Sequence, residues 1–535
     1  MRMGLPAAIN SSRQYQRANR RLPACALGAL LAGLMTFVLT SCSGSSSSSS
    51  SSTSTTTQLG NPIGANLTQI SSDGFTVGPG QHATEVEPHM LANGTMLVAA
   101  FQVGRIAPSF GPGAGATDIG WATSTDGGNT WTHGSLPGLT VGEGSGPYDA
   151  ASDPEVAYDA KHGVWMIASL PIASTQIPAV MVSRSTDGVT WQNPVSVDAT
   201  AENSDKNWIV CDTWASSPYY GNCYVEWDNP DAGDQILMST SSDGGMTWGA
   251  ALNTANLAGG LGGQPLVQPN GNVVVPIGLD SGEMAAFSSS NGGASWTATV
   301  AITQVQVHND AGGIRSGPLP TAAIDGAGTV WVMWEDCRFR ANCATNDLVY
   351  STSADGVTWS AVTRVPVDDV STAVDHFIPG LGIDPATSGA GAHVGIHFYE
   401  YAQSNCTQAT CLLSVNFISS ANGGSTWNAP VSLTGPMLVT WLPQSQNGLM
   451  VGDYIATAFT NGVPHGVFAV ATALSGTTFN EAMYTGQGLT VTAAGRQYSS
   501  ANDKPLHKLS DRIERERPEK GVRPPARRSA RKSAK

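Results

Sequence analysis

The chain has 535 residues, of which 61 are glycine, 14 are tryptophan and only 12% are charged. Coiled coils and helical bundles need far more Glu, Lys, Arg and Leu, so this composition excludes them. Residues 58–494 carry 8 basic and 35 acidic side chains, a net charge of −27. Such a surface disfavours nucleic acid and anionic membranes as partners.

The first residues predict export. A basic stretch ending at Arg20-Arg21 precedes an apolar run and the tetrad Leu39-Thr40-Ser41-Cys42, which resembles a bacterial lipobox. We expect residues 1–42 to be a lipoprotein-type signal segment with Cys42 as the lipidated residue; a cleaved secretory signal or an uncleaved anchor are the alternatives. The Ser/Thr-rich segment 43–60 cannot bury apolar surface and is expected to be a linker.

A short motif recurs along the following part of the chain. It reads Ser-x-Asp-Gly-Gly-x-Thr-Trp in its full form and ends at a tryptophan in every copy. Its acidic or amide position is occupied in turn by Asp126, Asp187, Asp243, Asn291, Asp355 and Asn422. The Asx-Gly step favours a tight hairpin turn, and the tryptophan offers a large apolar face to a neighbouring unit. The motif is therefore interpreted as a folding device.

Each repeat contains four short stretches with strand character, as in Pro320–Ile324, Thr329–Trp334, Leu348–Ser351 and the residues near Val362. A repeat of 40 to 70 residues with four antiparallel strands is typical of a propeller blade. We expect an all-β fold, a seven-bladed β-propeller over residues 61–494, with six blades as the alternative. Residues 60–80 contain two stretches with strand character, Asn66–Ile70 and Phe75–Val77. We expect this segment to close the ring by supplying a strand to the last blade. The N-terminal segment and the basic tail 495–535 are expected to be disordered.

The repeated motif resembles the Asp box, or BNR repeat, of the sialidase-like superfamily, over roughly residues 66–490. The resemblance implies a propeller that handles glycans, often as an exo-glycosidase, with its site at one mouth of the central channel. Sialidases use an arginine triad, a Tyr–Glu nucleophile pair and an Asp acid/base. Here Thr84–His89 carries an acidic residue where the family's Arg-Ile-Pro element places the first arginine, so sialidase activity itself is not expected.

Candidate site residues come from the starts of the first strands, because these line the axis of a propeller. Tyr454 best matches the family's nucleophile, with Glu335, Glu400 or Glu87 as its base. The candidate catalytic residues are Tyr454, Asp453, Glu87 and Asp153. The candidate substrate-binding residues are Arg315, Arg338, Asp205, Lys206, Asp375, His376 and Gln264. Glu155 falls in the same first strand as Asp153 and belongs to this polar ring, which could instead be purely structural.

Six cysteines remain after the signal segment, in the close pairs Cys211/Cys223, Cys337/Cys343 and Cys406/Cys411. Short loops close most readily, so we expect these pairs to form disulfides in an oxidising compartment. No zinc-type spacing occurs, and no cofactor is clearly implied. Clustered carboxylates could gather Ca²⁺, and the identity of any metal stays open.

The sequence thus predicts an exported protein, secreted or held in the cell envelope, that binds or hydrolyses an extracellular glycan or glycoconjugate. Contact with the membrane would run only through the lipid at Cys42. Whether the chain is an enzyme stays open; if it is, a sialidase-like glycoside hydrolase is expected. The alternatives are a non-catalytic propeller scaffold for protein or glycan recognition and another propeller enzyme, such as a Ca²⁺-dependent lyase.

Overall fold

The computed structural model describes residues 59–76, 78–108, 115–174, 176–198, 203–492, 499 and 503–505. The expected signal segment, most of the linker and nearly all of the basic tail lie outside these residues. By its contacts the chain divides into residues 1–59 and 60–535, and the fold described below is that of the second unit. Among the described residues, no helix is long and apolar enough to cross a membrane.

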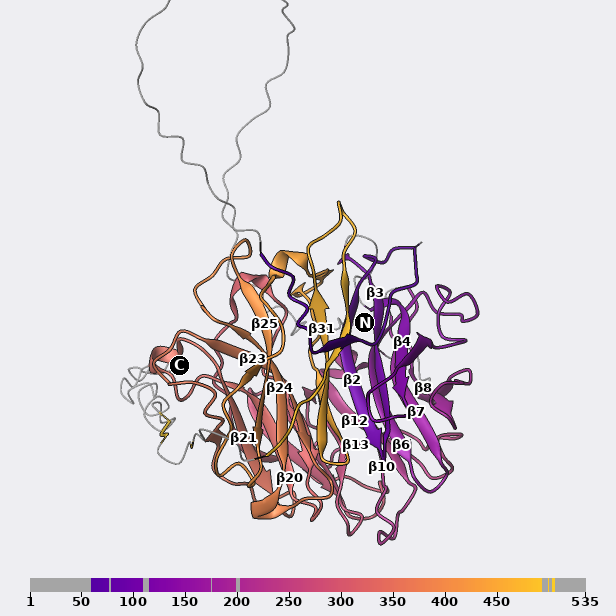
Figure 1. The fold of residues 1–535 in the computed structure, drawn as a ribbon. Helices are drawn as coiled ribbons and strands as arrows, with labels where there is room; N and C mark the ends of the chain where they lie inside the picture. The colour runs from indigo at the N-terminus through magenta and orange to yellow at the C-terminus, as the bar shows by residue number, and fades with distance from the viewer. Residues whose placement is uncertain are drawn as a thin grey trace, which may run out of the picture. The chain divides into compact units, whose positions relative to one another are not determined.

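The described residues form an all-β structure, which confirms the all-β part of the predicted fold class (Figure 1). Consecutive strands pair antiparallel, mostly in groups of four, which is consistent with a β-propeller. Within the described ranges, the named helical elements are single 3₁₀ turns, which are η3 (Pro230–Ala232), η4 (Ala311–Gly313), η5 (Ala341–Cys343), η6 (Gly389–Gly391) and η7 (Val439–Trp441).

The first two strand groups belong to one sheet that is joined by a single pairing between Ala116 and Ala151. The first group is β2 (Glu85–Asn93), β3 (Met96–Arg105), β4 (Ala116–Ser124) and β5 (Thr132–Ser135). The second group is β6 (Ala150–Asp159), β7 (Val164–Ile172), β8 (Val180–Ser185) and β9 (Val195–Asp198). The third is β10 (Asp205–Cys211), β11 (Cys223–Asn229), β12 (Gln235–Ser241) and β13 (Leu252–Asn253).

The middle of the chain repeats the same order. The fourth group is β14 (Gly260–Leu261), β15 (Leu266–Val267), β16 (Val273–Leu279), β17 (Glu283–Ser289) and β18 (Val300–Gln304). The fifth is β19 (Thr321–Ile324), β20 (Val330–Asp336), β21 (Asp347–Ser353) and β22 (Thr363–Arg364). The sixth is β23 (Asp375–Ile383), β24 (Val394–Tyr401), β25 (Leu412–Ser420), β26 (Val431–Ser432) and β27 (Met437–Leu438).

The last group combines strands from both ends of the second unit. After the small hairpin β28 (Gln444–Ser445) and β29 (Gly448–Leu449) come β30 (Ala456–Thr460), β31 (Val463–Ala471) and β32 (Glu481–Gly486). Strand β1 (Leu67–Gln69) pairs with β32, with Leu67 opposite Gly486, as expected for the stretch Asn66–Ile70. Phe75, by contrast, lies in no strand, and its backbone N–H donates to the side chain of Asp73.

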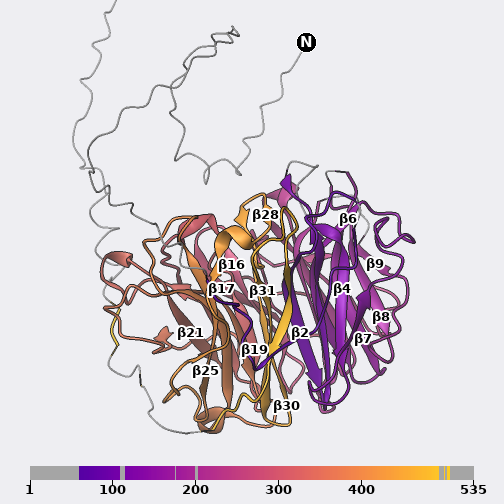
Figure 2. The same cartoon turned by 45° about the horizontal axis from the view of Figure 1, so that its top comes forward.

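The first strands of successive groups contact one another in chain order. β2 contacts β6, β6 contacts β10, β10 contacts β15, β15 contacts β19, β19 contacts β23 and β23 contacts β30. The last of them, β30, contacts β2 again. In Figures 1 and 2 the early strand β2 and the late strand β31 accordingly lie side by side. Side chains far apart in the sequence can therefore meet along these first strands.

The repeated turns share one set of hydrogen bonds. In the first copy the Ser124 hydroxyl donates to Asp126 Oδ1 over 2.9 Å and accepts from Gly128 N–H. Asp126 also accepts from the backbone and the hydroxyl of Thr130. In the fourth and sixth copies the amide oxygens of Asn291 and Asn422 accept the equivalent backbone N–H. Since these bonds are local, each turn is defined by the residues of its own motif.

Three of the tryptophans that end these turns pack on an aromatic ring of the preceding strand group. Ring centroids lie 6.5 Å apart for Trp191 and Trp121, 6.2 Å for Trp296 and Tyr224, and 6.3 Å for Trp427 and Tyr350. These contacts confirm the predicted packing role for three copies of the motif, because they tie each of the three turns to the preceding strand group.

The three disulfides join Cys211 to Cys223, Cys337 to Cys343 and Cys406 to Cys411, which confirms the predicted pairs.

Candidate functional site

The first strands of the opening three groups share an irregularity that positions polar side chains. The pairing register shifts between Val86 and His89 in β2, and in the same way around Asp153 in β6 and Lys206 in β10. At each shift one residue has a positive φ: Glu87 at 59°, Asp153 at 48° and Lys206 at 46°. Such bulges bend a strand and redirect a side chain, and strained residues of this kind concentrate at functional sites.

The three bulge residues meet in one ionic cluster. Lys206 Nζ lies 3.3 Å from Glu87 Oε1 and 3.3 Å from Asp153 Oδ2, and it also donates to Asp453 Oδ2. Arg315 binds the same Asp453 through two nitrogens, with Nε 2.6 Å from Oδ1. Asp453 is thus shared by two cations. We call Glu87, Asp153, Lys206, Arg315 and Asp453 the axial cluster.

Asp453 reaches this cluster because its strand group closes on the first one. The backbone N–H of Glu87 donates to Val451 O over 2.9 Å, which brings the segment before β30 against β2. Between them lies Gly452, with φ at 144°, where an added Cβ would lie 2.6 Å from Glu87 Cα. Only glycine fits this approach, so the residue fixes the distance between the two chain segments.

Beside the axial cluster lies a Tyr–Glu pair. The Tyr454 hydroxyl donates to Glu155 Oε1 over 2.7 Å, and Asn207 Nδ2 donates to the other carboxylate oxygen of Glu155. The half-buried ring of Trp208 packs edge-on against Tyr454 at 5.3 Å and lies 4.7 Å from His89. The hydroxyl of a tyrosine, a carboxylate that accepts its hydrogen bond and an aromatic surface are thereby brought together.

Burial makes several of these carboxyl groups weak acids. It raises the pKa of Glu87 to about 7, although Lys206 opposes the shift. Burial and the charge of Asp153 raise the pKa of Glu155 well above its usual value, and burial raises that of Asp205 to about 6. Glu87 can therefore hold a proton near neutral pH, as a general acid must.

The ion pairs of the cluster act in the opposite direction. Burial alone would raise the pKa of Asp453, but Arg315 and Lys206 outweigh it and lower that pKa far below the usual range. Burial alone would lower the pKa of Lys206, but the surrounding carboxylates outweigh burial and raise that pKa. Asp453 is therefore an ionised anchor for two cations and is unsuited to donate a proton.

The other residues predicted for the site lie in different surroundings. Asp205 accepts from the backbone of Lys206, and Gln264 accepts from Ala322 N–H. Arg338 is bound to Asp336 and to the end of β18, away from the axial cluster. Asp375 accepts from Asn346 N–H, beside His308. Of the predicted residues, the structure therefore gathers Glu87, Asp153, Lys206, Arg315, Asp453 and Tyr454.

Sequence reasoning missed the partner of Tyr454. Glu335, Glu400 and Glu87 were considered, but the hydroxyl contacts Glu155; Glu335 instead accepts from Ile378 N–H. Arg105, a loose match to the Arg-Ile-Pro element that was expected in a loop, ends β3, and its guanidinium donates to Gln102 and Gln446. The sequence did offer a signal for the bulges that position these side chains. A proline follows the bulge residue in Glu87-Pro88, Asp153-Pro154 and Ile378-Pro379. A proline interrupts the ladder of hydrogen bonds and so marks a bulge.

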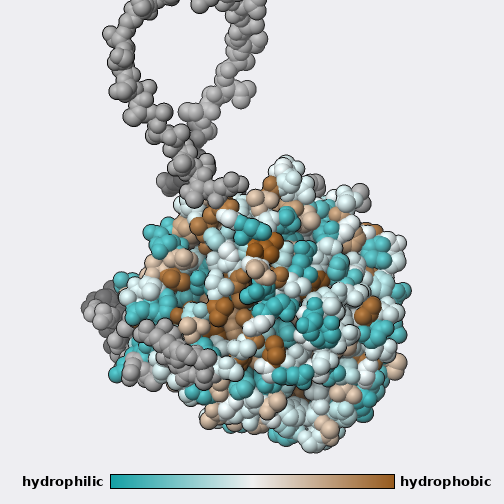
Figure 3. Space-filling view, in the orientation of Figure 1, coloured by the Kyte–Doolittle hydropathy of each residue, from teal (hydrophilic) through white to brown (hydrophobic). Residues whose placement is uncertain are grey.

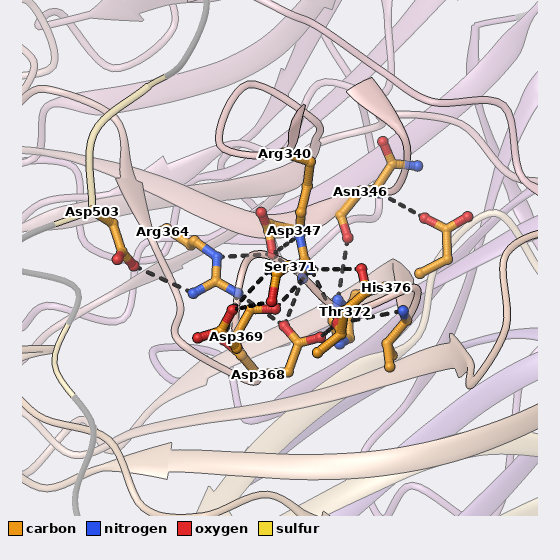
Figure 4. Close-up of polar contacts among 12 residues, drawn as sticks. Arg340, Asn346, Asp347, Arg364, Asp368, Asp369, Ser371, Thr372, His376 and Asp503 are labelled. Atoms are coloured by element: carbon orange, nitrogen blue, oxygen red, sulfur yellow. Dashed lines mark hydrogen bonds and ion pairs between the residues drawn. The ribbon is translucent and has the colours of Figure 1, made fainter. Parts of the chain in front are cut away.

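A second ionic network surrounds His376 (Figure 4). Arg340 Nη2 binds Asp347 and Asp368 over 2.6 and 2.5 Å, and Arg364 binds the same two aspartates. Asp347, Asp368 and His376 each place a ligand atom within 4.8 Å of the others. Two guanidinium groups already neutralise these carboxylates, so the donor set does not suit a cation, and the network is structural.

The surface also has a hollow of about 580 Å³, lined by Leu67, Phe417, Val431, Leu433 and Leu489 among others. Apolar side chains gather on this face of the molecule in Figure 3, over the region of β25 and β31. None of the described residues that line the hollow is charged. These residues offer no acid, base or cation, and the candidate chemistry stays with the axial cluster.

No protein-family model matches the chain, and no curated protein does. Several solved structures resemble it. The NanB sialidase from Streptococcus pneumoniae is 13% identical, with 80% of this chain and 71% of that chain covered and a TM-score of 0.41. The Hadza microbial sialidase Hz136 is 15% identical, with 72% and 75% covered and a TM-score of 0.39. AofleA from Arthrobotrys oligospora is 13% identical, with 69% and 90% covered and a TM-score of 0.39. With TM-scores below 0.5, these likenesses support no conclusion about function.

Proposed function

We propose that residues 61–494 form a seven-bladed β-propeller whose six repeated turns are Asp boxes. The circuit of contacts from β2 through β30 and back to β2 supports closure, as does the pairing of β1 with β32. The shared hydrogen bonds of Asp126 and its equivalents support the Asp-box assignment. On this arrangement the axial cluster lies at one mouth of the central channel.

We use the name axial site for the axial cluster together with the adjoining Tyr454 and Glu155. We infer that the axial site hydrolyses a glycosidic bond. The observation that carries this proposal is the 2.7 Å hydrogen bond between the Tyr454 hydroxyl and Glu155, formed by residues 299 positions apart. Glu155 would accept the phenolic proton while the Tyr454 oxygen attacks the anomeric carbon. Burial raises the pKa of Tyr454 well above its usual value, so its proton needs a strong base. The raised pKa of Glu155 makes its ionised carboxylate a stronger base than an ordinary glutamate.

Glu87 would protonate the oxygen of the leaving group. Its pKa of about 7 keeps a large share of it protonated near neutral pH. In a retaining glycosidase the same residue then takes a proton from the water that releases the sugar. Lys206 and Gln102, which contact its two carboxylate oxygens, would fix its orientation.

The compartment that fits this activity is outside the cytoplasm. The signal segment, Cys42 and the linker to residue 60 would export the chain and hold it in the cell envelope, or release it by secretion. The three disulfides agree with an oxidising compartment. The substrate would then be an extracellular glycan or glycoconjugate.

The test uses the full chain and a panel of 4-methylumbelliferyl glycosides of neutral and acidic sugars. We expect release of the fluorophore from at least one glycoside and loss of that activity in Tyr454→Phe and Glu155→Gln. Tyr484→Phe is the matched control, because the Tyr484 hydroxyl contacts Gln69 in the closing sheet. Undiminished turnover in Tyr454→Phe would contradict the proposed role of Tyr454.

A second candidate function is glycan binding without hydrolysis. It is favoured by the half-buried ring of Trp208 beside Tyr454, because an aromatic face suits a sugar without any transfer of a proton. A chain that binds a glycan, hydrolyses none of the panel and binds equally well as Tyr454→Phe would support this alternative.

A further inference from the structure

Every cation of the axial site already has a partner. Lys206 contacts three carboxylates, and the fork of Arg315 is taken by Asp453. Arg105 donates to the side-chain oxygens of Gln102 and Gln446. A bidentate guanidinium–carboxylate pair is the arrangement by which proteins usually clamp an acidic ligand, and here an internal aspartate occupies it.

An incoming carboxylate would also compete with carboxylates that already bind the cations. Asp153 and Asp453 contact Lys206, and Asp453 also binds Arg315. To reach Arg315, an acidic sugar would have to displace Asp453, whose charge is held by two cations. Like charges brought together in a poorly solvated site repel strongly, so this exchange is unfavourable.

The remaining surface suits the uncharged faces of a sugar. Trp208 is half-buried and stands at the edge of Tyr454. Aromatic side chains with a few polar groups around them are typical of small-ligand sites, and the carboxylate of Asp153, 7% exposed, is an acceptor suited to a hydroxyl donor. The site therefore combines an apolar platform with a hydroxyl acceptor.

We propose that the axial site takes uncharged sugars, and that Asp453 is the residue that excludes carboxylated ones by occupying Arg315 and Lys206. This inference rests on the proposed function and specifies its substrate class. It assigns Asp453 a role in specificity in place of the catalytic role expected from the sequence.

The experiment compares the full chain with Asp453→Asn on an array of glycans printed in matched pairs, neutral and capped with N-acetylneuraminic acid. We expect the parent chain to bind neutral members only. Asp453→Asn should gain at least about tenfold in affinity for the acidic members, because Arg315 regains a free bidentate face. Asp153→Asn removes one charge while Asp453 stays on Arg315, so it should show no such gain.

The outcomes separate the inference from the proposed function. Binding of acidic members by the parent chain as strongly as neutral ones would overturn the inference and leave the proposed function standing. A parent chain that neither binds nor hydrolyses any glycan would overturn both. If circular dichroism shows that Asp453→Asn does not fold, the preference of the parent chain for neutral glycans still decides. If it folds, adding Arg315→Gln should abolish its gain in affinity for acidic glycans. A gain that persists would contradict the role of Arg315.

Discussion

At the scale of single residues, the tryptophans that end the repeated turns differ in burial. Trp191 is 7% exposed and packs on Trp121, whereas Trp359 is half-buried. Trp191→Ala should lower the free energy of unfolding by about 3–5 kcal/mol, as for other buried aromatics. Trp359→Ala should lower the free energy of unfolding clearly less, because less of the Trp359 ring is buried on folding. Urea denaturation of both variants checks this; equal losses would contradict the packing described.

Residue identities at the axis could be predicted only in part. Glu87, Asp153 and Lys206 were identifiable because they begin first strands, and those strands converge. The contact between Tyr454 and Glu155 was not, because alternation along a strand fails at a bulge: the extra residue reverses which face the following side chains occupy. In β6 this reversal separates Asp153, which faces Lys206, from Glu155, which faces Tyr454.

At the scale of elements, the repeated turns should make the fold sensitive to acid. Hydrogen bonds from Thr130 lower the pKa of Asp126 to about 2, and Asp187, Asp243 and Asp355 are lowered likewise. Because the folded pKa lies below the unfolded value of about 4, each turn adds stability that is present above pH 4 and lost as the pH falls through 2. Replacing all four aspartates by Asn should flatten that loss.

The chain contains its own precedent for this change, since Asn291 and Asn422 hold the same turn through their amide oxygens. Thermal melts followed by circular dichroism between pH 2 and pH 7 provide the measurement. A quadruple variant that loses stability between pH 4 and pH 2 as steeply as the parent chain would contradict the role given to these carboxylates.

The order of the strand groups could be predicted from the spacing of the repeated turns, because each turn is held by hydrogen bonds within one short segment. Side chains at the ends of strands were harder to place. Arg338 and His376 were expected at the axis, but Arg338 folds back on Asp336, two residues away, and His376 joins the network of Figure 4. That network depends on the return of residues 366–374 over β21, which no local pattern encodes.

At the scale of the whole molecule, buried acids should make the protein less stable as the pH rises. Burial raises the pKa of Glu85 and of Glu335 to about 8. Since these folded values exceed the unfolded one, the stabilisation is fully present below about pH 4.5 and is lost as the pH rises toward 8. The free energy of unfolding should therefore fall between pH 5 and pH 8, by at most about 1.4 kcal/mol per pH unit for each such group.

Glu85→Gln should reduce this slope, because an amide can still accept the bonds from Ser71 and Met483 without titrating. Glu283→Gln, at a half-buried position on β17, is the control. Denaturation at pH 5, 6.5 and 8 measures the slope. An unchanged slope in Glu85→Gln would show that the buried carboxyl of Glu85 does not govern the pH dependence.

The central claim is that closure of the strand groups brings Tyr454, Glu155 and Glu87 together as a glycosidase site. Trapping with activated 2-deoxy-2-fluoro glycosides of neutral sugars tests it most directly, because a retaining enzyme forms a covalent glycosyl intermediate. Mass spectrometry of the digested full chain should find one sugar on the peptide that contains Tyr454, and none in Tyr454→Phe. A chain left unmodified by the whole set, or modified at another residue, would contradict the account.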